Sequence, residues 1–173
     1  MFEMCPETRL EIKTADLFAT PPDKWWEKWI CRILGAKTFH WGMLVAADDR
    51  GWMITESIIG KGVALTRFDY PRAYIYRIKD IGEIDWKGLI GIAADYGAYP
   101  YNWKMTFRTA IWWFLKHYLG KAIPIIKDKA VNCQEWVVLI AYELGAKVIA
   151  EDEYPMCANL EKSPYLEELG EIR

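Results

Sequence analysis

The sequence has only two histidines, no long apolar run and almost no net charge. These absences argue against particular classes of site and partner. The four cysteines include no CxxC pair and no metal-finger spacing. No stretch approaches the ~18 consecutive apolar residues of a membrane span. A net charge of −2 gives no sign of nucleic acid as a default partner. We therefore expect no metal, no other cofactor and no nucleic-acid partner.

The N-terminus lacks the features of a signal peptide. Its first seven residues, Met1 to Glu7, have neither a basic start nor an apolar core. Free thiols in a reducing compartment are then the simplest interpretation of the cysteines. We expect a cytoplasmic protein, and delivery as part of a virion or a secretion apparatus is the alternative.

Aromatic residues, in contrast, are abundant. Ten Trp and ten Tyr in 173 residues fit either a bulky core or the binding of an apolar ligand, and the core is the more common use. Three of the tryptophans fall in a helix predicted over 23–34, with Lys24, Lys28 and Arg32 on its polar side. Such a helix usually covers a sheet, and contact with a membrane surface is the alternative.

The hydrophobic periodicity predicts an α+β fold in which a small antiparallel sheet packs against helices. Strands are expected over 15–18, 39–47, 51–57, 63–68 and 73–78, and helices over 23–34, 86–96, 104–119 and 133–144. The length of 173 residues favours one domain, 1–173, with a core of about 15–145. The acidic segment 146–173 is interpreted as a solvated extension, or alternatively as a partner-binding one.

A cysteine at a predicted helix start is the first candidate for chemistry. Cys133 follows Asn132, a good N-cap residue, and Gly145 ends the apolar run that begins there. A thiol in the first turn lies near unpaired backbone N–H groups and the positive end of the helix dipole, and both favour the thiolate. Cys133 is therefore a nucleophile if a histidine reaches it, and otherwise an ordinary buried cysteine.

His40 is the candidate partner because it starts a predicted strand. If residues 48–50 form a three-residue loop, Gly42 pairs with Glu56, and Glu56 becomes the diagonal neighbour of His40 on the same face. Such a carboxylate would fix the imidazole tautomer and favour its protonated form. A slip of one residue would instead leave Glu56 as a solvated strand carboxylate. His117, late in a predicted helix, is expected to be solvated or to interact with the C-terminal end of the helix dipole.

The predicted helix also carries an apolar stripe in line with the thiol. Cys133 shares this stripe with Val137, Ile140 and Leu144. We expect the stripe to pack on the sheet, so that the thiol faces the surface that carries His40. A Cys–His pair oriented by a carboxylate requires such an arrangement.

At these positions the sequence resembles the circularly permuted NlpC/P60 superfamily of papain-like enzymes. His40-Trp41-Gly42 looks like the superfamily's strand start, and Thr55-Glu56-Ser57-Ile58 looks like its acidic segment. Asn132-Cys133, with Val137, is similar to the helix start of the lecithin:retinol acyltransferase branch. The resemblance covers about 15–145.

Other features look closer to the bacterial YiiX-like branch. These are the glutamate at position 56 and the segment Tyr101-Asn102-Trp103. The usual Tyr-Asp pair of that branch appears here as Tyr101-Asn102, and its Cys-Ser-Glu appears as Cys133-Gln134-Glu135. These departures concern the side of the site that meets the substrate.

The resemblance implies roles for these residues. Cys133 would be the nucleophile, with its backbone N–H in the oxyanion hole, His40 the general base and Glu56 the orienting residue. The residues implied as substrate contacts are Trp41, Tyr101 and Gln134.

The resemblance also implies an enzyme that forms an acyl-enzyme. Its YiiX-like features favour an amide substrate, either a peptide or a peptidoglycan-like molecule. The aromatic surplus and the helix start favour a lipid ester, cleaved or transferred by a phospholipase or acyltransferase. A non-catalytic structural or binding module that keeps the fold is the remaining alternative.

Overall fold

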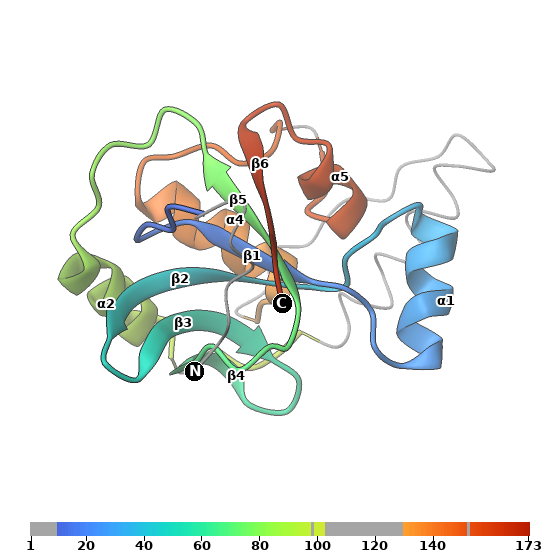
Figure 1. Cartoon of the computed structure of the whole chain (residues 1–173), viewed down its shortest axis with the longest axis horizontal. Helices are drawn as coiled ribbons and strands as arrows, with labels where there is room; N and C mark the ends of the chain where they lie inside the picture. Colours follow the sequence, from blue (N-terminus) through green and yellow to red (C-terminus); the bar gives the residue numbers. More distant parts are fainter. Residues whose placement is uncertain (1–9, 98, 103–129, 152) are drawn as a thin grey trace.

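The computed structural model describes residues 10–97, 99–102, 130–151 and 153–173. Within these residues six strands form one sheet in the order β4-β3-β2-β1-β5-β6, and all neighbouring strands are antiparallel (Figure 1). The strands are β1 (Leu17–Thr20), β2 (His40–Asp48), β3 (Gly51–Ile58), β4 (Gly62–Arg67), β5 (Ala73–Ile78) and β6 (Leu166–Ile172). The helices are α1 (Trp25–Leu34), α2 (Trp86–Asp95), α4 (Cys133–Glu143) and α5 (Cys157–Glu161). The predicted α+β class is confirmed.

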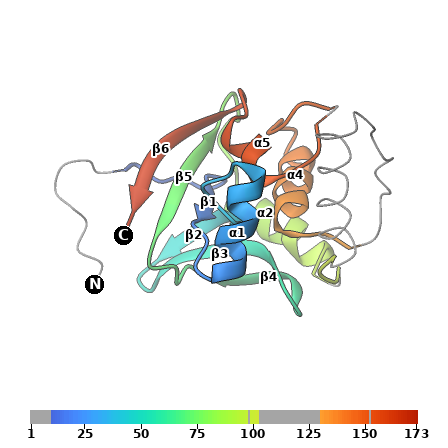
Figure 2. The same cartoon turned by 90° about the vertical axis from the view of Figure 1, so that its right-hand side faces the viewer.

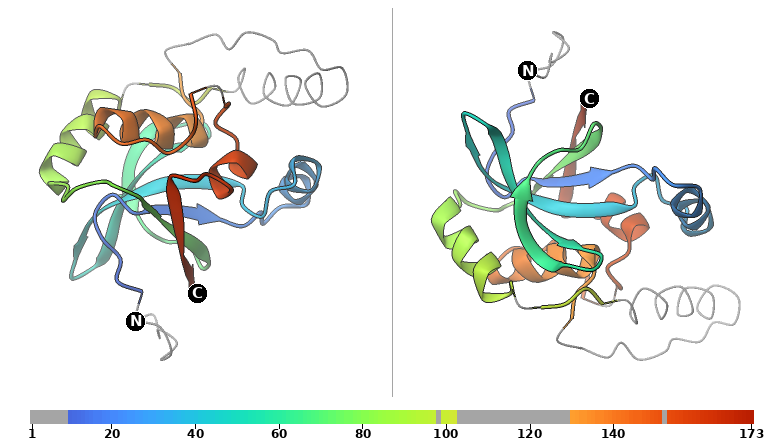
Figure 3. Two further views of the ribbon diagram at one scale, coloured as in Figure 1. Left: turned by 90° about the horizontal axis from the view of Figure 1, so that it is seen from above. Right: turned by 90° about the horizontal axis from the view of Figure 1, so that it is seen from below.

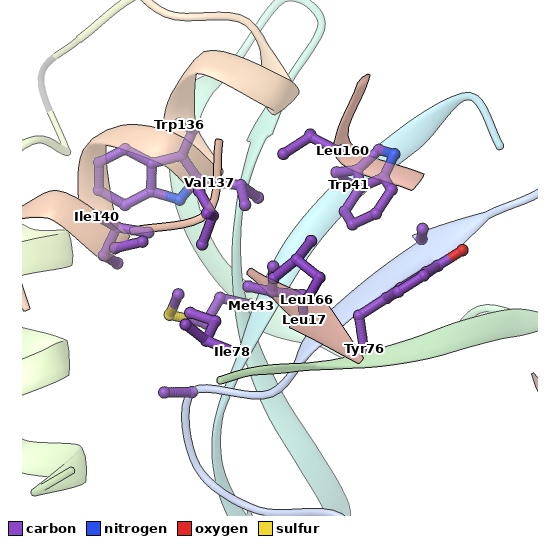
Figure 4. Close-up of a cluster of buried hydrophobic side chains, with 14 of the residues drawn as sticks. Leu17, Trp41, Met43, Tyr76, Ile78, Trp136, Val137, Ile140, Leu160 and Leu166 are labelled. Carbon is purple, nitrogen blue, oxygen red and sulfur yellow. The ribbon is translucent and has the colours of Figure 1, made fainter. Parts of the chain in front are cut away.

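One face of the sheet packs against α2 and α4 and carries the larger core. Trp136, Val137 and Ile140 of α4 lie in the same buried cluster as Trp41 and Met43 of β2 (Figure 4). Burial of these large side chains is the main contribution to holding α4 on the sheet. In the described part of the chain, no helix combines the length and the apolarity needed to cross a bilayer.

The other face of the sheet carries a smaller core. It contains Phe18, Leu44, Ile54 and Ile75, which alternate along their strands with residues of the larger core. His40, Gly42 and Glu56 belong to this second face by the same alternation. The sheet therefore has apolar side chains on both sides, which accounts for part of the aromatic and aliphatic excess in the sequence.

The β2–β3 hairpin brings the predicted pair into register by a route that differs from the expected one. The turn has two residues rather than three, since Asp48 pairs with Gly51. A bulge between Leu44 and Ala46 then shifts the register by one residue, so Gly42 still pairs with Glu56. The expected pairing of Gly42 with Glu56 is confirmed, and the expected loop is wrong by one residue.

The acidic C-terminal segment is part of the fold, which corrects its interpretation as a solvated extension outside a core that ends near 145. β6 pairs with β5 along its length, and α5 buries Cys157, Ala158 and Leu160. Two acidic residues of β6, Glu167 and Glu168, are exposed; Glu168 pairs with Lys37, and Glu171 pairs with Arg72. These charges hid the strand in the sequence, because only Leu166 of its first three residues is buried.

Several predicted features lie outside the described residues. They are Cys5, the helix over 104–119 and His117. The other predicted strands and helices are confirmed to within two residues at each end.

Candidate active site

Cys133 is the first residue of α4, as the sequence predicts. The Asn132 side chain accepts a hydrogen bond of 2.8 Å from the Glu135 N–H, and the Glu135 carboxylate accepts one of 2.8 Å from the Asn132 N–H. This reciprocal cap satisfies two backbone donors and fixes the helix start. The N–H groups of the first turn have no partner within a helix, so the Cys133 N–H can donate to a developing oxyanion.

The segment that leads into Cys133 is tied to the sheet and to a neighbouring loop. Ser57 on β3 donates a hydrogen bond of 2.7 Å to the carbonyl of Val131. Asn102 donates one of 3.0 Å to the carbonyl of Ala130, and Tyr101 forms a parallel bridge with Val131. These bonds set the position of the thiol relative to β3, the strand that carries Glu56.

His40 and Glu56 form a direct pair. The His40 ring donates from Nε2 to Oε2 of Glu56 at 2.6 Å, and Glu56 is buried. Because Glu56 occupies Nε2, the ring nitrogen left for Cys133 is Nδ1. The pair thus fixes which nitrogen of the imidazole meets the sulfur.

Glu56 is held by more than the histidine. Its Oε1 accepts a hydrogen bond of 2.6 Å from Thr66, and its Oε2 accepts a second one from the Tyr70 hydroxyl. Burial raises the pKa of Glu56, but the bonds from His40, Thr66 and Tyr70 and the charge of His40 outweigh it, so this pKa lies below its usual range. The carboxylate stays ionised although it is almost fully enclosed.

The electrostatic environment of His40 favours its protonated form. Burial lowers the pKa of His40, but the charge and hydrogen bond of Cys133, together with those of Glu56, outweigh burial and raise it to about 10. The ring therefore lies between two acidic partners, the thiol on one side and the carboxylate on the other. An imidazolium held in this way stabilises a thiolate beside it.

The two candidate residues meet at the end of the sheet and not across its face. The Trp136 indole donates to the Thr55 hydroxyl at 3.2 Å, which places α4 on the face opposite to that of Glu56. His40 is the first residue of β2 and Cys133 the first of α4, so both lie where their elements begin. The expectation that the α4 stripe packs on the same face as His40 is wrong, yet the thiol and the imidazole still interact.

Aromatic side chains pack beside the imidazole of His40. Phe18 lies 6.2 Å from the His40 ring and 5.3 Å from the Tyr70 ring, centroid to centroid. Gly42 makes room for Phe18, because a Cβ at this position would lie 2.5 Å from that ring. The absence of a side chain at Gly42 therefore lets the Phe18 ring pack at this position.

A cavity of about 150 Å³ opens beside Cys133. Its wall is mostly apolar and comes from α1, from the loop before β2, and from the start of α5. The residues that line it include Trp29, Ile30, Ile33, Leu34, Phe39, Tyr101, Cys133, Gln134, Met156 and Cys157. Binding sites for small molecules are typically apolar clefts with a few polar groups, as here.

The cavity tests the three predicted substrate contacts. Tyr101 and Gln134 line it, and the Gln134 amide also donates to the Phe39 carbonyl at 3.0 Å. Trp41 does not line it: its ring is buried, stacks on Tyr76 at 4.9 Å and donates to Thr38. The prediction of Trp41 as a substrate contact is wrong, because alternation along β2 turns its side chain into the core.

Three thiols line this one cavity. Cys31, Cys133 and Cys157 are all free and buried, with exposed fractions of 4%, 3% and 5%. Burial, followed by the charges of Glu161 and Glu27, raises the pKa of Cys31 to about 11. Burial and the charge of Cys133 raise the pKa of Cys157 well above its usual value. Of these three thiols, Cys133 is the one whose charge and hydrogen bond raise the pKa of His40.

Sequence reasoning missed the residues that hold the start of β2. The Glu161 carboxylate on α5 accepts hydrogen bonds from the N–H groups of Lys37 and Thr38 and from the Thr38 hydroxyl. Cys157 donates to the Phe39 carbonyl at 3.2 Å. α5 thus fixes the three residues before His40, and only a tertiary contact could have indicated it.

Comparisons with known proteins give one informative result. No protein-family profile matches the chain, and no curated protein matches it. The crystal structure of the metalloprotein YiiX from Escherichia coli O157:H7 (DUF1105) has a similar fold, with a TM-score of 0.59 and 15% sequence identity. The match covers 90% of this chain and 95% of that one.

The neighbour's description as a metalloprotein does not transfer to the residues seen here. Within the described ranges, no three His, Cys, Asp or Glu side chains are grouped so that they could hold a metal ion. The described residues therefore do not fit a metal centre. At 15% identity the likeness is one of fold, and this chain has a YiiX-like fold.

Proposed function

We propose that the protein is a cysteine hydrolase that cleaves an amide bond through an acyl-enzyme on Cys133. The observation that carries this proposal is the arrangement of three side chains. His40 donates from Nε2 to the buried Glu56, while the same ring interacts with Cys133 at the first residue of α4. A nucleophile, a base and a group that orients the base are the elements that this chemistry requires.

In the first half of the proposed reaction, the Cys133 thiolate attacks the substrate carbonyl carbon. Negative charge develops on the carbonyl oxygen, toward which the Cys133 N–H can donate. The carbon–nitrogen bond then breaks, and the proton on His40 Nδ1 passes to the leaving amine. Glu56 keeps the imidazole in place throughout.

In the second half, water replaces the amine. Neutral His40 takes a proton from the water at Nδ1, and the hydroxide attacks the thioester carbonyl. The carbon–sulfur bond breaks, releasing a carboxylic acid and restoring the thiolate–imidazolium pair. Peptide and peptidoglycan-like amides are the substrates favoured by the YiiX-like sequence features.

The apolar cavity supports a second candidate, hydrolysis or transfer of a lipid-derived acyl ester. The cavity lies directly beside Cys133, and Ile30, Leu34 and Met156 supply apolar wall. An acyl chain bound there would place its carbonyl carbon near the sulfur. Each methylene buried contributes about 0.8 kcal/mol, or roughly a fourfold gain in binding.

A series of acyl donors separates these candidates. p-Nitrophenyl esters and acyl amides of increasing chain length are compared with peptide amides and peptidoglycan fragments by kcat/KM. If the cavity takes the acyl group, we expect kcat/KM to rise by about tenfold or more from acetyl to medium chains.

A matched pair of variants controls the chain-length series. Ile30→Phe partly fills the cavity and should remove the chain-length preference, whereas Ile59→Phe changes a side chain on the surface and should keep it. Preference for peptide or peptidoglycan amides with no chain-length effect would favour the first candidate. Turnover of none of these substrates by the wild-type protein would contradict both.

A further inference from the structure

The outer face of α1 carries a stripe of large apolar side chains. Trp25 is 80% exposed, Trp29 62% and Ile33 38%. They follow one another at intervals of four residues, so they lie in one line along the helix. Exposed tryptophans are costly in water unless the surface has a partner.

Positive charge borders this stripe. Lys28 and Arg32 lie one turn apart along its edge, are exposed, and form no ion pair within the part of the chain that the structure describes. The acidic residue of this helix, Glu27, already has partners other than Lys28 and Arg32, since its carboxylate accepts hydrogen bonds from the N–H groups of Asp23 and Lys24. The outer face of α1 is thus aromatic and basic in a chain whose net charge is −2.

The packing of α1 explains why this face points outward. The opposite side buries Cys31 and holds Trp26 edge-on to Phe39 at 5.2 Å. In Figure 2, α1 is the element nearest the viewer, in front of the ends of β1 and β2. Figure 3 shows it projecting from those strand ends, away from α2. Its outer face can therefore meet a flat surface without obstruction from the described core.

The exposed stripe is continuous with the cavity. Trp29 and Ile33 belong to the stripe and also line the cavity that reaches Cys133. A surface that contacts α1 would therefore lie at the mouth of this cavity. An apolar molecule could pass from that surface toward the thiol without crossing water.

We propose that α1 docks the protein on an anionic phospholipid bilayer. Trp25, Trp29 and Ile33 would enter the boundary between headgroups and acyl chains, while Lys28 and Arg32 contact the lipid phosphates. Trp and basic side chains together are typical of helices that lie in this boundary. The docking is independent of whether Cys133 is catalytic, and it would select substrates that reside in the membrane.

A second copy of the chain is a weaker candidate for the partner. The three apolar side chains together expose roughly 400 Å², about half of the ~800 Å² that each partner buries in a standard interface. In a symmetric dimer, moreover, the positive charges of α1 would approach their own copies. A bilayer satisfies both the apolar and the charged groups.

Sedimentation with vesicles tests the proposal on the full chain. Vesicles of phosphatidylcholine mixed with phosphatidylglycerol should bind the protein, and pure phosphatidylcholine should bind it several-fold more weakly. The double variant Trp25→Ala/Trp29→Ala should lower the partition coefficient by about tenfold or more. Lys28→Gln/Arg32→Gln should remove the preference for the anionic lipid. The matched control is Trp86→Ala, a 44% exposed tryptophan on α2, and should bind as the wild type does.

The remaining outcomes each decide the question. Equal vesicle binding by the wild type and the Trp25→Ala/Trp29→Ala variant would overturn the proposal, as would an equal loss in Trp86→Ala. Self-association abolished by Trp25→Ala, without vesicle binding, would overturn it and assign the face to a second copy. Circular dichroism and urea unfolding without vesicles show that the variants are folded. Because the alkylation rate of Cys133 in the wild type reports the proposed catalytic pair separately, the failure of docking and the failure of catalysis are distinguishable.

Discussion

Replacing Cys133 with alanine is expected to lower hydrolysis by at least about 10³-fold, because the acyl-enzyme is proposed to form on its sulfur. His40→Ala should cause a loss of similar size, since the thiolate loses the imidazolium that stabilises it and the leaving amine loses its proton donor. The double variant should be no worse than either single one, because the two residues act as a unit. The measurement is kcat/KM on the best substrate from the acyl-donor series.

The control for this prediction is another thiol of the same cavity. Cys31 is equally buried but donates to the Thr38 carbonyl, and the pKa of its thiol is raised by burial and by nearby carboxylates. Cys31→Ala is therefore expected to keep activity within a few-fold of the wild type. Hydrolysis that survives in Cys133→Ala would show that the reaction takes place at another site.

The second large effect is expected from Glu56→Gln. Glu56 raises the pKa of His40 through its charge and its hydrogen bond. Loss of the charge should lower the pKa of His40 from about 10, so the basic limb of the pH profile of kcat/KM moves to lower pH. A role for Glu56 in structure alone would reduce the amount of folded protein but would leave this limb in place.

The free energy of unfolding should also change in Glu56→Gln. Its dependence on pH follows from the pKa shifts of His40 and Glu56. The pKa of His40 is raised from 6.5, so its contribution to stability is complete below 6.5 and disappears as the pH rises through about 10. The pKa of Glu56 is lowered from 4.5, so its contribution is complete above 4.5 and disappears as the pH falls further. The pair therefore stabilises the wild type most between pH 4.5 and pH 6.5 and loses its effect gradually above and below this range.

Breaking a buried pair of this kind costs about 3–5 kcal/mol. Urea unfolding of Glu56→Gln across this pH range should show a loss of this order near neutral pH and a flatter dependence on pH. The matched control is Glu167→Gln on β6, where the side chain is exposed, and it should change stability by less than about 0.5 kcal/mol. Equal losses in the two variants would contradict the ion pair.

The positions of five strands along the chain and the pairing of Gly42 with Glu56 could be predicted from the sequence because they depend on local patterns. Alternation along 40–47 and 51–57 is regular, and the polar turn between them limits the register. The bulge at Val45 was not predictable, since nothing in an apolar run marks the residue that will lack a partner. Its one-residue shift cancelled the error in the predicted loop.

The remaining errors involve contacts between segments far apart in the chain. β6 was missed because its acidic residues interrupt any apolar alternation and its partner, β5, lies about 90 residues away. The Tyr70 bond to Glu56 comes from an irregular segment with no periodicity. Thr66, in contrast, could have been predicted: Ala64 lies opposite Glu56 on β4, so Thr66 is a diagonal neighbour on the same face.

The side of the sheet that α4 covers was also beyond sequence reasoning. A stripe of Cys133, Val137 and Ile140 predicts that the helix packs on a sheet, but it does not say on which face. The Trp136–Thr55 hydrogen bond places α4 on the face opposite to Glu56. His40 and Cys133 can still meet because each begins its own element at the same end of the sheet.

The most direct test of the central claim is the alkylation rate of each cysteine by iodoacetamide at neutral pH, followed by mass spectrometry of the peptides. Cys31, Cys133 and Cys157 line one cavity and have nearly equal exposed fractions, so a difference in rate reports ionisation and not access. We predict that Cys133 reacts at least about tenfold faster than the other two, and that His40→Ala removes the difference. Equal rates for the three thiols in the wild type, or an unchanged advantage of Cys133 in His40→Ala, would contradict the catalytic pair.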